Sequence, residues 1–272
     1  MGVLNCTPDS FSDGGLFLDE HRALKHAESM LARGASIIDV GAESTRPRAA
    51  PVPADEQIAR AMGIVRRLVK HGATVSIDTT SPAVAARALD EGAVMINTVD
   101  LRPARELAIV ARERHAMLVL SHSRGSMAEM RGFSEAPETA YGDVVADVKR
   151  ELSLARDVAV EAGLSPLDIL LDPGLGFHKR ASQSLALCAR LDELVALGHF
   201  VLVGPSRKSF LSVVTAERDG EQAAPGDRLG ATIAACLACA AKGAAVLRVH
   251  DVAEVRQALA FDRALSKGAG DV

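Results

Sequence analysis

Short segments rich in Val, Ile and Leu recur along the whole chain, and each is followed by polar or turn-forming residues. Continuous apolar runs of this length are typical of β-strands that are buried on both faces. The segments that fit this description are residues 3–4, 37–40, 74–77, 94–96, 117–120, 169–171, 200–203 and 245–249. The pattern therefore predicts eight strands in a parallel sheet.

The stretches between these segments show a different spacing, with apolar residues three or four positions apart as in an amphipathic helix. The clearest examples are residues 22–31, 58–69, 83–89, 144–162, 185–197 and 229–241. Several end on a glycine, as in ARGA, DEGA, EAGL and AKGA. Glycine readily adopts the left-handed conformation that ends a helix. Strand and helix are therefore expected to alternate.

Eight strand–helix units in a chain of 272 residues predict a single (β/α)8 TIM barrel of the α/β class. We expect residues 1–266 to form the barrel and residues 267–272 to form a flexible tail. A doubly wound open sheet is the alternative. Because active sites of barrels lie at the carboxyl ends of the strands, functional side chains should follow the strands directly.

Short polar side chains do stand at these positions. Asn5 follows the first strand, and Asp78, Asn97 and Asp172 end the third, fourth and sixth. Half-buried carboxylates and amides need hydrogen-bond partners, which the edge of a heterocycle with amino and lactam groups would supply. Each residue could instead cap the following helix. Their occurrence at several strand ends favours a ligand.

Residues that can carry a positive charge follow the second, seventh and eighth strands. They are Arg46, Lys208, Arg248 and His250. Arg binds phosphate oxygens in a bidentate manner, and the SRKS segment is expected to open a helix whose free N–H groups attract anions. The loops after strands 7 and 8 are also the usual phosphate site of barrels. An anionic substrate is expected, although an ion-pair network would use the same side chains.

Composition and charge exclude several other classes. A formal net charge of -4 without a long basic run argues against a nucleic-acid surface. The four cysteines form neither a disulfide framework nor a zinc motif, and the pair Cys236 and Cys239 lies in an Ala-rich helical pattern. The first ten residues lack the features of a signal peptide, and the apolar stretch 231–241 is too short to span a bilayer. We expect a soluble, cytoplasmic protein.

Several motifs resemble, in order and spacing, those of the dihydropteroate synthase family. They are MGVLNCTPDSFSDGG, IDVGAESTRP, VSIDTTSPAVAARAL, GAVMIN, LLDPGLGFHK, VGPSRKSFL and VLRVHDV, and together they span nearly the whole chain. The resemblance implies a barrel transferase of folate biosynthesis. It would condense 6-hydroxymethyl-7,8-dihydropterin diphosphate with p-aminobenzoate to give 7,8-dihydropteroate and diphosphate. The resemblance also implies Mg²⁺ as cofactor, a homodimer and inhibition by sulfonamides.

The resemblance further implies a role for each matching residue. The pterin ring would be held by Asp78, Asn97, Asp172 and Lys208. The diphosphate would be held by Asn5, Thr45, Arg46, Arg248 and His250, with Asn5 also binding the metal. The p-aminobenzoate pocket would be formed by Phe11, Pro47, Phe177 and Ser209. The catalytic set would be Asp13, Lys208, Arg248 and His250.

The chemistry of this reaction fits these assignments. Departure of diphosphate leaves positive charge on the pterin methylene group, which a carboxylate such as Asp13 would stabilise. Cationic side chains would stabilise the leaving group, and the weakly basic aryl amine needs no strong general base. Residues 10–15 are predicted to act as a glycine-hinged lid that excludes water from the cation.

At five positions the chain departs from the family pattern. Thr98 stands where Asp is usual, Ser121 and Ser123 where Met is usual, and Arg48 and His178 where Gly is usual. We expect the serines to loosen packing against the pterin, and Arg48 and His178 to add bulk near p-aminobenzoate. A non-catalytic pterin-binding paralogue and a related pterin-binding methyltransferase domain are the alternatives. The TPDSFSDGG segment and the complete set of cations favour catalysis.

Overall fold

Eight parallel strands, β1 to β8, form one sheet in sequence order. The sheet closes on itself, because Val3 N donates to Val249 O at 3.0 Å and Val249 N donates to Met1 O at 2.9 Å. This closure confirms the predicted (β/α)8 barrel and excludes a doubly wound sheet, whose strand order would reverse. The computed structural model describes residues 1–6, 15–43, 52–125, 128–130, 132, 134–137, 140–216 and 223–267, with residues 15–19 described by backbone alone.

Each predicted apolar segment overlaps one strand, although the bounds differ by one or two residues in most cases. The strands are β1 (Gly2–Asn5), β2 (Ile38–Gly41), β3 (Val75–Asp78), β4 (Met95–Thr98), β5 (Met117–Ser121), β6 (Ile169–Asp172), β7 (Phe200–Val203) and β8 (Val246–Leu247). Neighbouring strands are in parallel register throughout. The carboxyl ends of all the strands therefore open at the same mouth.

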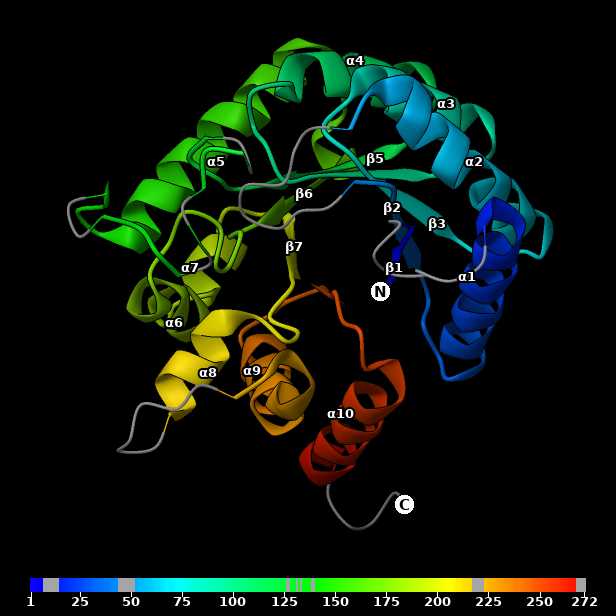
Figure 1. Ribbon diagram of the computed structural model, residues 1–272. Coiled ribbons are helices and arrows are strands. Elements are labelled where there is room, and N and C mark those ends of the chain that lie inside the picture. Colours follow the sequence, from blue (N-terminus) through cyan, green and yellow to red (C-terminus); the bar gives the residue numbers. More distant parts are fainter. Residues whose placement is uncertain are drawn as a thin grey trace.

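Each predicted helical stretch overlaps a helix of the structure, and the helices lie outside the sheet (Figure 1). They are α1 (Gly15–Ala32), α2 (Ala54–Lys70), α3 (Pro82–Asp90), α4 (Ala104–Glu113), α5 (Val144–Glu161), α6 (Ala181–Ala189), α7 (Asp192–Val195), α8 (Ser209–Thr215), α9 (Leu229–Ala241) and α10 (Val252–Lys267). Short 3-10 helices precede β6 (Pro166–Asp168) and α9 (Pro225–Arg228). Within the described ranges, no helix is both long and apolar enough to cross a bilayer.

One predicted helix, residues 185–197, is divided in two. The helix α6 ends at Arg190, whose backbone leaves the helical region at φ −119° and ψ 31°. The Arg190 guanidinium group bonds to Glu193 of α7 at 2.6 Å and to Asp143, the N-cap residue of α5, at 3.0 Å. These contacts between neighbouring helices accompany the break. Of the predicted tail, residues 267–272, Lys267 is the last residue of α10, and residues 268–272 lie outside the described residues.

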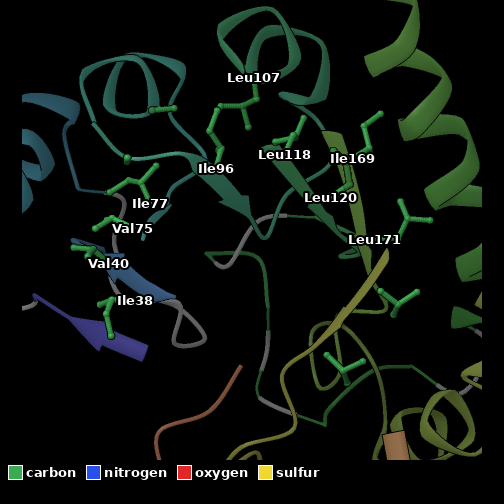
Figure 2. Packing of buried hydrophobic residues seen from close by; sticks show 14 of the residues in the cluster. Ile38, Val40, Val75, Ile77, Ile96, Leu107, Leu118, Leu120, Ile169 and Leu171 are labelled. Carbon is green, nitrogen blue, oxygen red and sulfur yellow. The ribbon is translucent and has the colours of Figure 1, made fainter. Parts of the chain in front are cut away.

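Residues along each strand alternate between two environments, because successive side chains point to opposite faces of a sheet. One set packs against the helices (Figure 2) and includes Ile38, Val40, Val75, Ile77, Ile96, Leu118, Leu120, Ile169 and Leu171. The other set faces the barrel interior, where Met95, Val119, Leu170 and Leu202 form a separate apolar cluster. Polar residues of this second set follow toward the carboxyl ends of the strands. The fold thus directs them into the mouth.

Candidate active site

Arg248, which follows β8, lies between two carboxylates from β2 and β3. Its Nε donates to Asp39 Oδ2 at 2.6 Å and its Nη2 donates to Asp78 Oδ2 at 2.7 Å. Burial alone would lower the pKa of Arg248, but Asp39 and Asp78 outweigh burial and raise it. The guanidinium group is therefore a fixed positive charge at the centre of the mouth.

Asp78 itself is buried and does not cap α3. That cap is Ser81, whose Oγ accepts from Val84 N at 3.5 Å. Burial raises the pKa of Asp78 to about 7, although Arg248 opposes this shift. Asp78 is thus available to a ligand, and its charge is sensitive to what binds beside it.

Asn97, the second-to-last residue of β4, is hydrogen-bonded to one of these carboxylates. Its Nδ2 donates to Asp39 Oδ2 at 3.0 Å. Within the part of the chain that the structure describes, Asn97 Oδ1, Asp39 Oδ1 and Ser76 Oγ are buried and have no hydrogen-bond partner. Buried acceptors of this kind require a donor from a ligand or from water. The N–H groups of a heterocycle are suitable donors.

Asp172 is the last residue of β6, and Lys208 follows the neighbouring strand β7 as the N-cap residue of α8. Asp172 accepts from Ser121 Oγ at 3.2 Å and from Gly174 N at 2.7 Å, which orients its carboxylate. The ammonium group of Lys208 donates to Leu175 O and lies 4.2 Å from the centroid of the Phe177 ring. Although the side chain is not completely buried, desolvation lowers the pKa of Lys208 to about 8, against the opposing charge of Asp172.

His250 lies next to Arg248 and is hydrogen-bonded to Ser206. Its Nδ1 is 3.0 Å from Ser206 Oγ, and its backbone N donates to the same oxygen at 3.1 Å. Burial, with a contribution from Arg248, lowers the pKa of His250 to about 4, so the ring is neutral. Because Ser206 Oγ accepts from the backbone, its hydrogen can be given to Nδ1. This assigns the proton of the ring to Nε2, which can then donate to an anion.

Ser209 and Asn5 complete the described part of the predicted site. Ser209 begins α8 as predicted, and its Oγ is 2.9 Å from Ser134 Oγ. Asn5 is exposed and is paired in register with Gly41, and a Cβ at position 41 would lie 3.7 Å from Asn5 Oδ1. The amide oxygen of Asn5 is therefore open toward the mouth.

The structure brings together most of the predicted site residues. The described members are Asn5, Asp78, Asn97, Asp172, Phe177, Lys208, Ser209, Arg248 and His250. The remaining members, Phe11, Asp13, Thr45, Arg46 and Pro47, lie outside the described residues, as do Arg48 and the predicted lid.

Besides Ser121, which donates to Asp172, three of the unusual residues make local contacts. Thr98 is buried, and its Oγ1 donates to Asp100 O at 3.0 Å. Ser123 Oγ is 2.9 Å from Nδ1 of His178, which has a positive φ of 48°. The strand alternation places Thr98 on the opposite face from Asn97, and so away from the mouth.

Asp39 was not predicted as a site residue, yet it joins Arg248 to Asn97. The sequence does contain a signal for it, because a carboxylate in the apolar segment Ile37–Val40 is costly to bury without a partner. Its register partner is Ser76, whose next neighbour on the same face of β3 is Asp78. Strand alternation alone therefore directs Asp39 toward the same interior.

Comparison with known proteins identifies relatives over nearly the whole chain. A family model described as "Pterin binding enzyme" matches residues 1–250. A dihydropteroate synthase from Mycobacterium leprae is 44% identical over 253 residues, covering 93% of this chain and 88% of the relative. A probable bifunctional folylpolyglutamate synthase/dihydropteroate synthase from Haloferax volcanii is 42% identical over 93% of this chain, which spans only 29% of that longer protein.

Solved structures give the same result. The dihydropteroate synthase of Xanthomonas albilineans with 4-aminobenzoic acid has a TM-score of 0.89 and 36% identity, over 98% of this chain and 93% of that one. The enzyme of Yersinia pestis in complex with a sulfonamide drug has a TM-score of 0.87 and 34% identity, over 98% of this chain and 94% of that one. The similarity covers every strand that contributes to the mouth.

Proposed function

Because this chain belongs to the pterin-binding enzyme family, we propose that it is a dihydropteroate synthase of folate biosynthesis. It condenses 6-hydroxymethyl-7,8-dihydropterin diphosphate with p-aminobenzoate and releases diphosphate. The observation that carries this proposal is the arrangement of buried acceptors beside fixed cations in one mouth. The acceptors suit a pterin edge, and the cations suit a leaving diphosphate.

The pterin ring is the ligand that these acceptors fit. Its amino and lactam N–H groups donate to the carboxylate of Asp172, whose orientation is set by Ser121 and Gly174. Lys208 donates to the lactam oxygen, and Asn97 offers the free oxygen Oδ1. Each polar group of the ring then meets a group of opposite hydrogen-bonding character.

The diphosphate is proposed to bind beside Arg248 and His250, which follow β8. Arg248 supplies a permanent charge, and the neutral His250 supplies a hydrogen bond from Nε2. Thr45 and Arg46 are proposed to complete this site. As the bond to the pterin methylene breaks, negative charge grows on the diphosphate and positive charge on the methylene, where Asp13 is proposed to stabilise it. The aryl amine then attacks the methylene carbon and loses a proton.

Magnesium is proposed to accompany the diphosphate. Mg²⁺ takes oxygen ligands and keeps several waters, and the exposed amide oxygen of Asn5 fits that preference. Among the described residues, no group of three or more His, Cys, Asp or Glu side chains is arranged to hold a metal ion. Asn5 would therefore share the ion with the substrate. When bound, the ion neutralises charge on the diphosphate.

The second substrate is proposed to bind beside Phe177, with Ser209 receiving its carboxylate. Phe11 and Pro47 are proposed to form the rest of this pocket. The relatives from Xanthomonas albilineans and Yersinia pestis have structures with 4-aminobenzoic acid and a sulfonamide drug respectively. By this similarity, we propose that sulfonamides compete with p-aminobenzoate in this chain as well.

A homodimer in the cytoplasm is also proposed. Exposed apolar side chains mark α8 and α10, which flank α9 (Figure 1). They are Val213, Val214, Phe261 and Leu265. Exposed apolar side chains on helices that flank a common neighbour suit an interface between subunits. Four free, buried cysteines suit a reducing compartment.

A diphosphate-release assay tests the proposed reaction. Purified protein is given the pterin diphosphate and Mg²⁺, with and without p-aminobenzoate, and dihydropteroate is followed by chromatography. We expect release that depends on p-aminobenzoate and matches dihydropteroate formed. A folded protein that binds the pterin diphosphate and forms no dihydropteroate would instead be a non-catalytic paralogue or a methyltransferase domain.

A further inference from the structure

Lys179 is a completely buried lysine in the loop between β6 and α6. Its Nζ lies 2.9 Å from His122 Nδ1 and donates to the backbone oxygens of His122, Gly174 and Phe177 at 3.1, 3.0 and 3.1 Å. All four neighbours are hydrogen-bond acceptors. An ammonium group has three protons and no acceptor of its own, so this environment matches its charged form.

These contacts join two neighbouring parts of the barrel. His122 follows β5, whereas Gly174 and Phe177 lie in the loop after β6, and the two strands are adjacent (Figure 1). The connection is tight, because a Cβ at Gly174 would collide with the carbonyl oxygen of His122. Gly174 also has a positive φ of 65°, which only glycine adopts without strain. Lys179 therefore fixes the position of one loop relative to the other.

His122 connects this ammonium group to α5. Its Nε2 donates to Glu151 Oε2 at 2.9 Å, and Arg124 Nε donates to the same oxygen at 3.1 Å. Burial, with a contribution from Lys179, lowers the pKa of His122 to about 4, so the ring is neutral and its Nδ1 can accept from Lys179. Burial also lowers the pKa of Lys179, whereas Asp172 and Glu151 act against that shift. The net pKa of Lys179 still lies well below its usual value, whereas the four acceptors around Nζ favour the protonated form.

The loop held by Lys179 forms one wall of the mouth. Lys208 contacts the same loop from the mouth, where its ammonium group donates to Leu175 O and lies over the Phe177 ring. Gly174 N, in turn, donates to the Asp172 carboxylate. The segment from Asp172 to Phe177 is therefore held from both sides. One lysine faces the mouth and the other lies behind it.

We propose that Lys179 is a positioning residue for the pterin pocket, because its buried ammonium group fixes the orientation of Asp172 and Phe177. It acts through backbone oxygens and touches no substrate, since its side chain is completely buried. This inference rests on the proposed function in one respect, because it names the pterin as the ligand of the pocket. Loss of the ammonium group releases the loop. The affinity for the pterin should therefore fall by a larger factor than the rate of the chemical step.

The test compares Lys179→Met, which removes every donor, with Lys179→Gln, which keeps an uncharged donor. Leu107→Ala on α4 is the control, because Leu107 is fully buried in the helix-facing layer and lies on a different element. The measurements are steady-state kcat and KM for the pterin diphosphate, and calorimetric Kd for the same compound without p-aminobenzoate. Urea unfolding is measured in parallel to record the stability of each variant.

We expect Lys179→Met to raise KM and Kd about tenfold while kcat falls less than about threefold. Lys179→Gln should show a smaller rise in KM and Kd. If the Met variant does not fold, the Gln variant alone is used for the comparison with wild type. Leu107→Ala should lose stability with KM unchanged. An unchanged Kd in a folded Lys179 variant, or an equal rise in the control, would overturn the inference. A wild-type protein that binds the pterin diphosphate but forms no dihydropteroate would overturn the proposed function instead, leaving the Kd comparison intact.

Discussion

The guanidinium group of Arg248 is joined to the carboxylate of Asp39 by a 2.6 Å hydrogen bond, although the two residues are 209 positions apart in the sequence. A second bond joins Arg248 to Asp78. The planar guanidinium group is thus oriented by two carboxylates before any substrate arrives. Such preorganisation allows a charge to stabilise a transition state without further rearrangement.

The variant Asp39→Asn tests this orientation. Loss of the carboxylate removes one anchor of Arg248, and we expect kcat/KM to fall about a hundredfold. The exposed Asp157→Asn on α5 is a matched control that should leave kcat/KM unchanged. Steady-state kinetics on the wild type and both variants measure this change in kcat/KM. Equal values for Asp39→Asn and the wild type would show that Asp78 alone orients Arg248.

Asp172→Asn and Lys208→Ala should each abolish measurable turnover and leave the fold intact. Both side chains lie at the mouth, so their replacement removes groups proposed to contact the ring and creates no cavity in the helix-facing layer. Circular dichroism confirms folding, and product formation is followed by chromatography. Lys242→Ala, at the end of α9, is the control for loss of a lysine. A wild-type rate in either site variant would contradict the pterin assignment.

Acid should destabilise the protein through His250. Burial lowers the pKa of this group from 6.5 to about 4 in the folded chain. Between these pH values the unfolded chain binds the proton and the folded chain does not, so stability is lost as pH falls. Asp78, whose pKa is raised, acts in the opposite direction across much of the same range. Comparison with a His250→Gln variant therefore separates the contribution of His250.

Urea unfolding at a series of pH values between 6.5 and 4 measures this effect. The free energy of unfolding of the wild type should fall by about 1–2 kcal/mol more than that of His250→Gln across the range. His122, which has a similarly lowered pKa, remains in both proteins and cancels in the comparison. Parallel pH dependence in the two proteins would refute the contribution assigned to His250.

Sulfonamides should compete with p-aminobenzoate, with an affinity that depends on His178. This residue follows Phe177, its Nδ1 lies 2.9 Å from Ser123 Oγ, and we propose that it narrows the aryl-amine pocket. We expect His178→Gly to change the inhibition constant by up to about tenfold, which is the effect of a single hydrogen bond. Arg48→Gly is measured alongside. Unchanged constants in both variants would refute a role for these residues in inhibitor binding.

Much of the barrel could be predicted because apolar segments buried on both faces give a strong and local signal. The polar residues at the strand ends were equally visible, since Asp78, Asn97 and Asp172 each come directly after an apolar segment. The break between α6 and α7 could not be predicted, because Arg190 is bonded to Asp143, a residue distant in sequence. Local periodicity contains no information on such contacts.

The hydrogen bonds between side chains within the site could not be predicted from the sequence either. Asp39 shares a strand with apolar residues, and its bond to Arg248 exists only once β8 lies against β1 in a closed barrel. Lys179 stands in a loop where exposure would be expected of a lysine, and its burial depends on backbone oxygens from two loops. Every residue has a backbone carbonyl oxygen, so the sequence does not indicate which of them will accept a hydrogen bond from a side chain such as that of Lys179.

Closure of the barrel has a consequence for how the protein is made. Of the eight strands of the barrel, β1 is synthesised first, and the segment around Val249 that pairs with its free edge is produced after β8. Pairing across so long a separation is slow, and an unpaired edge of a parallel sheet can bind other chains until it is covered. The nascent protein must therefore remain unaggregated until its final strand is released. Arg248 lies in that final segment, so the substrate site is completed only by the last step of assembly.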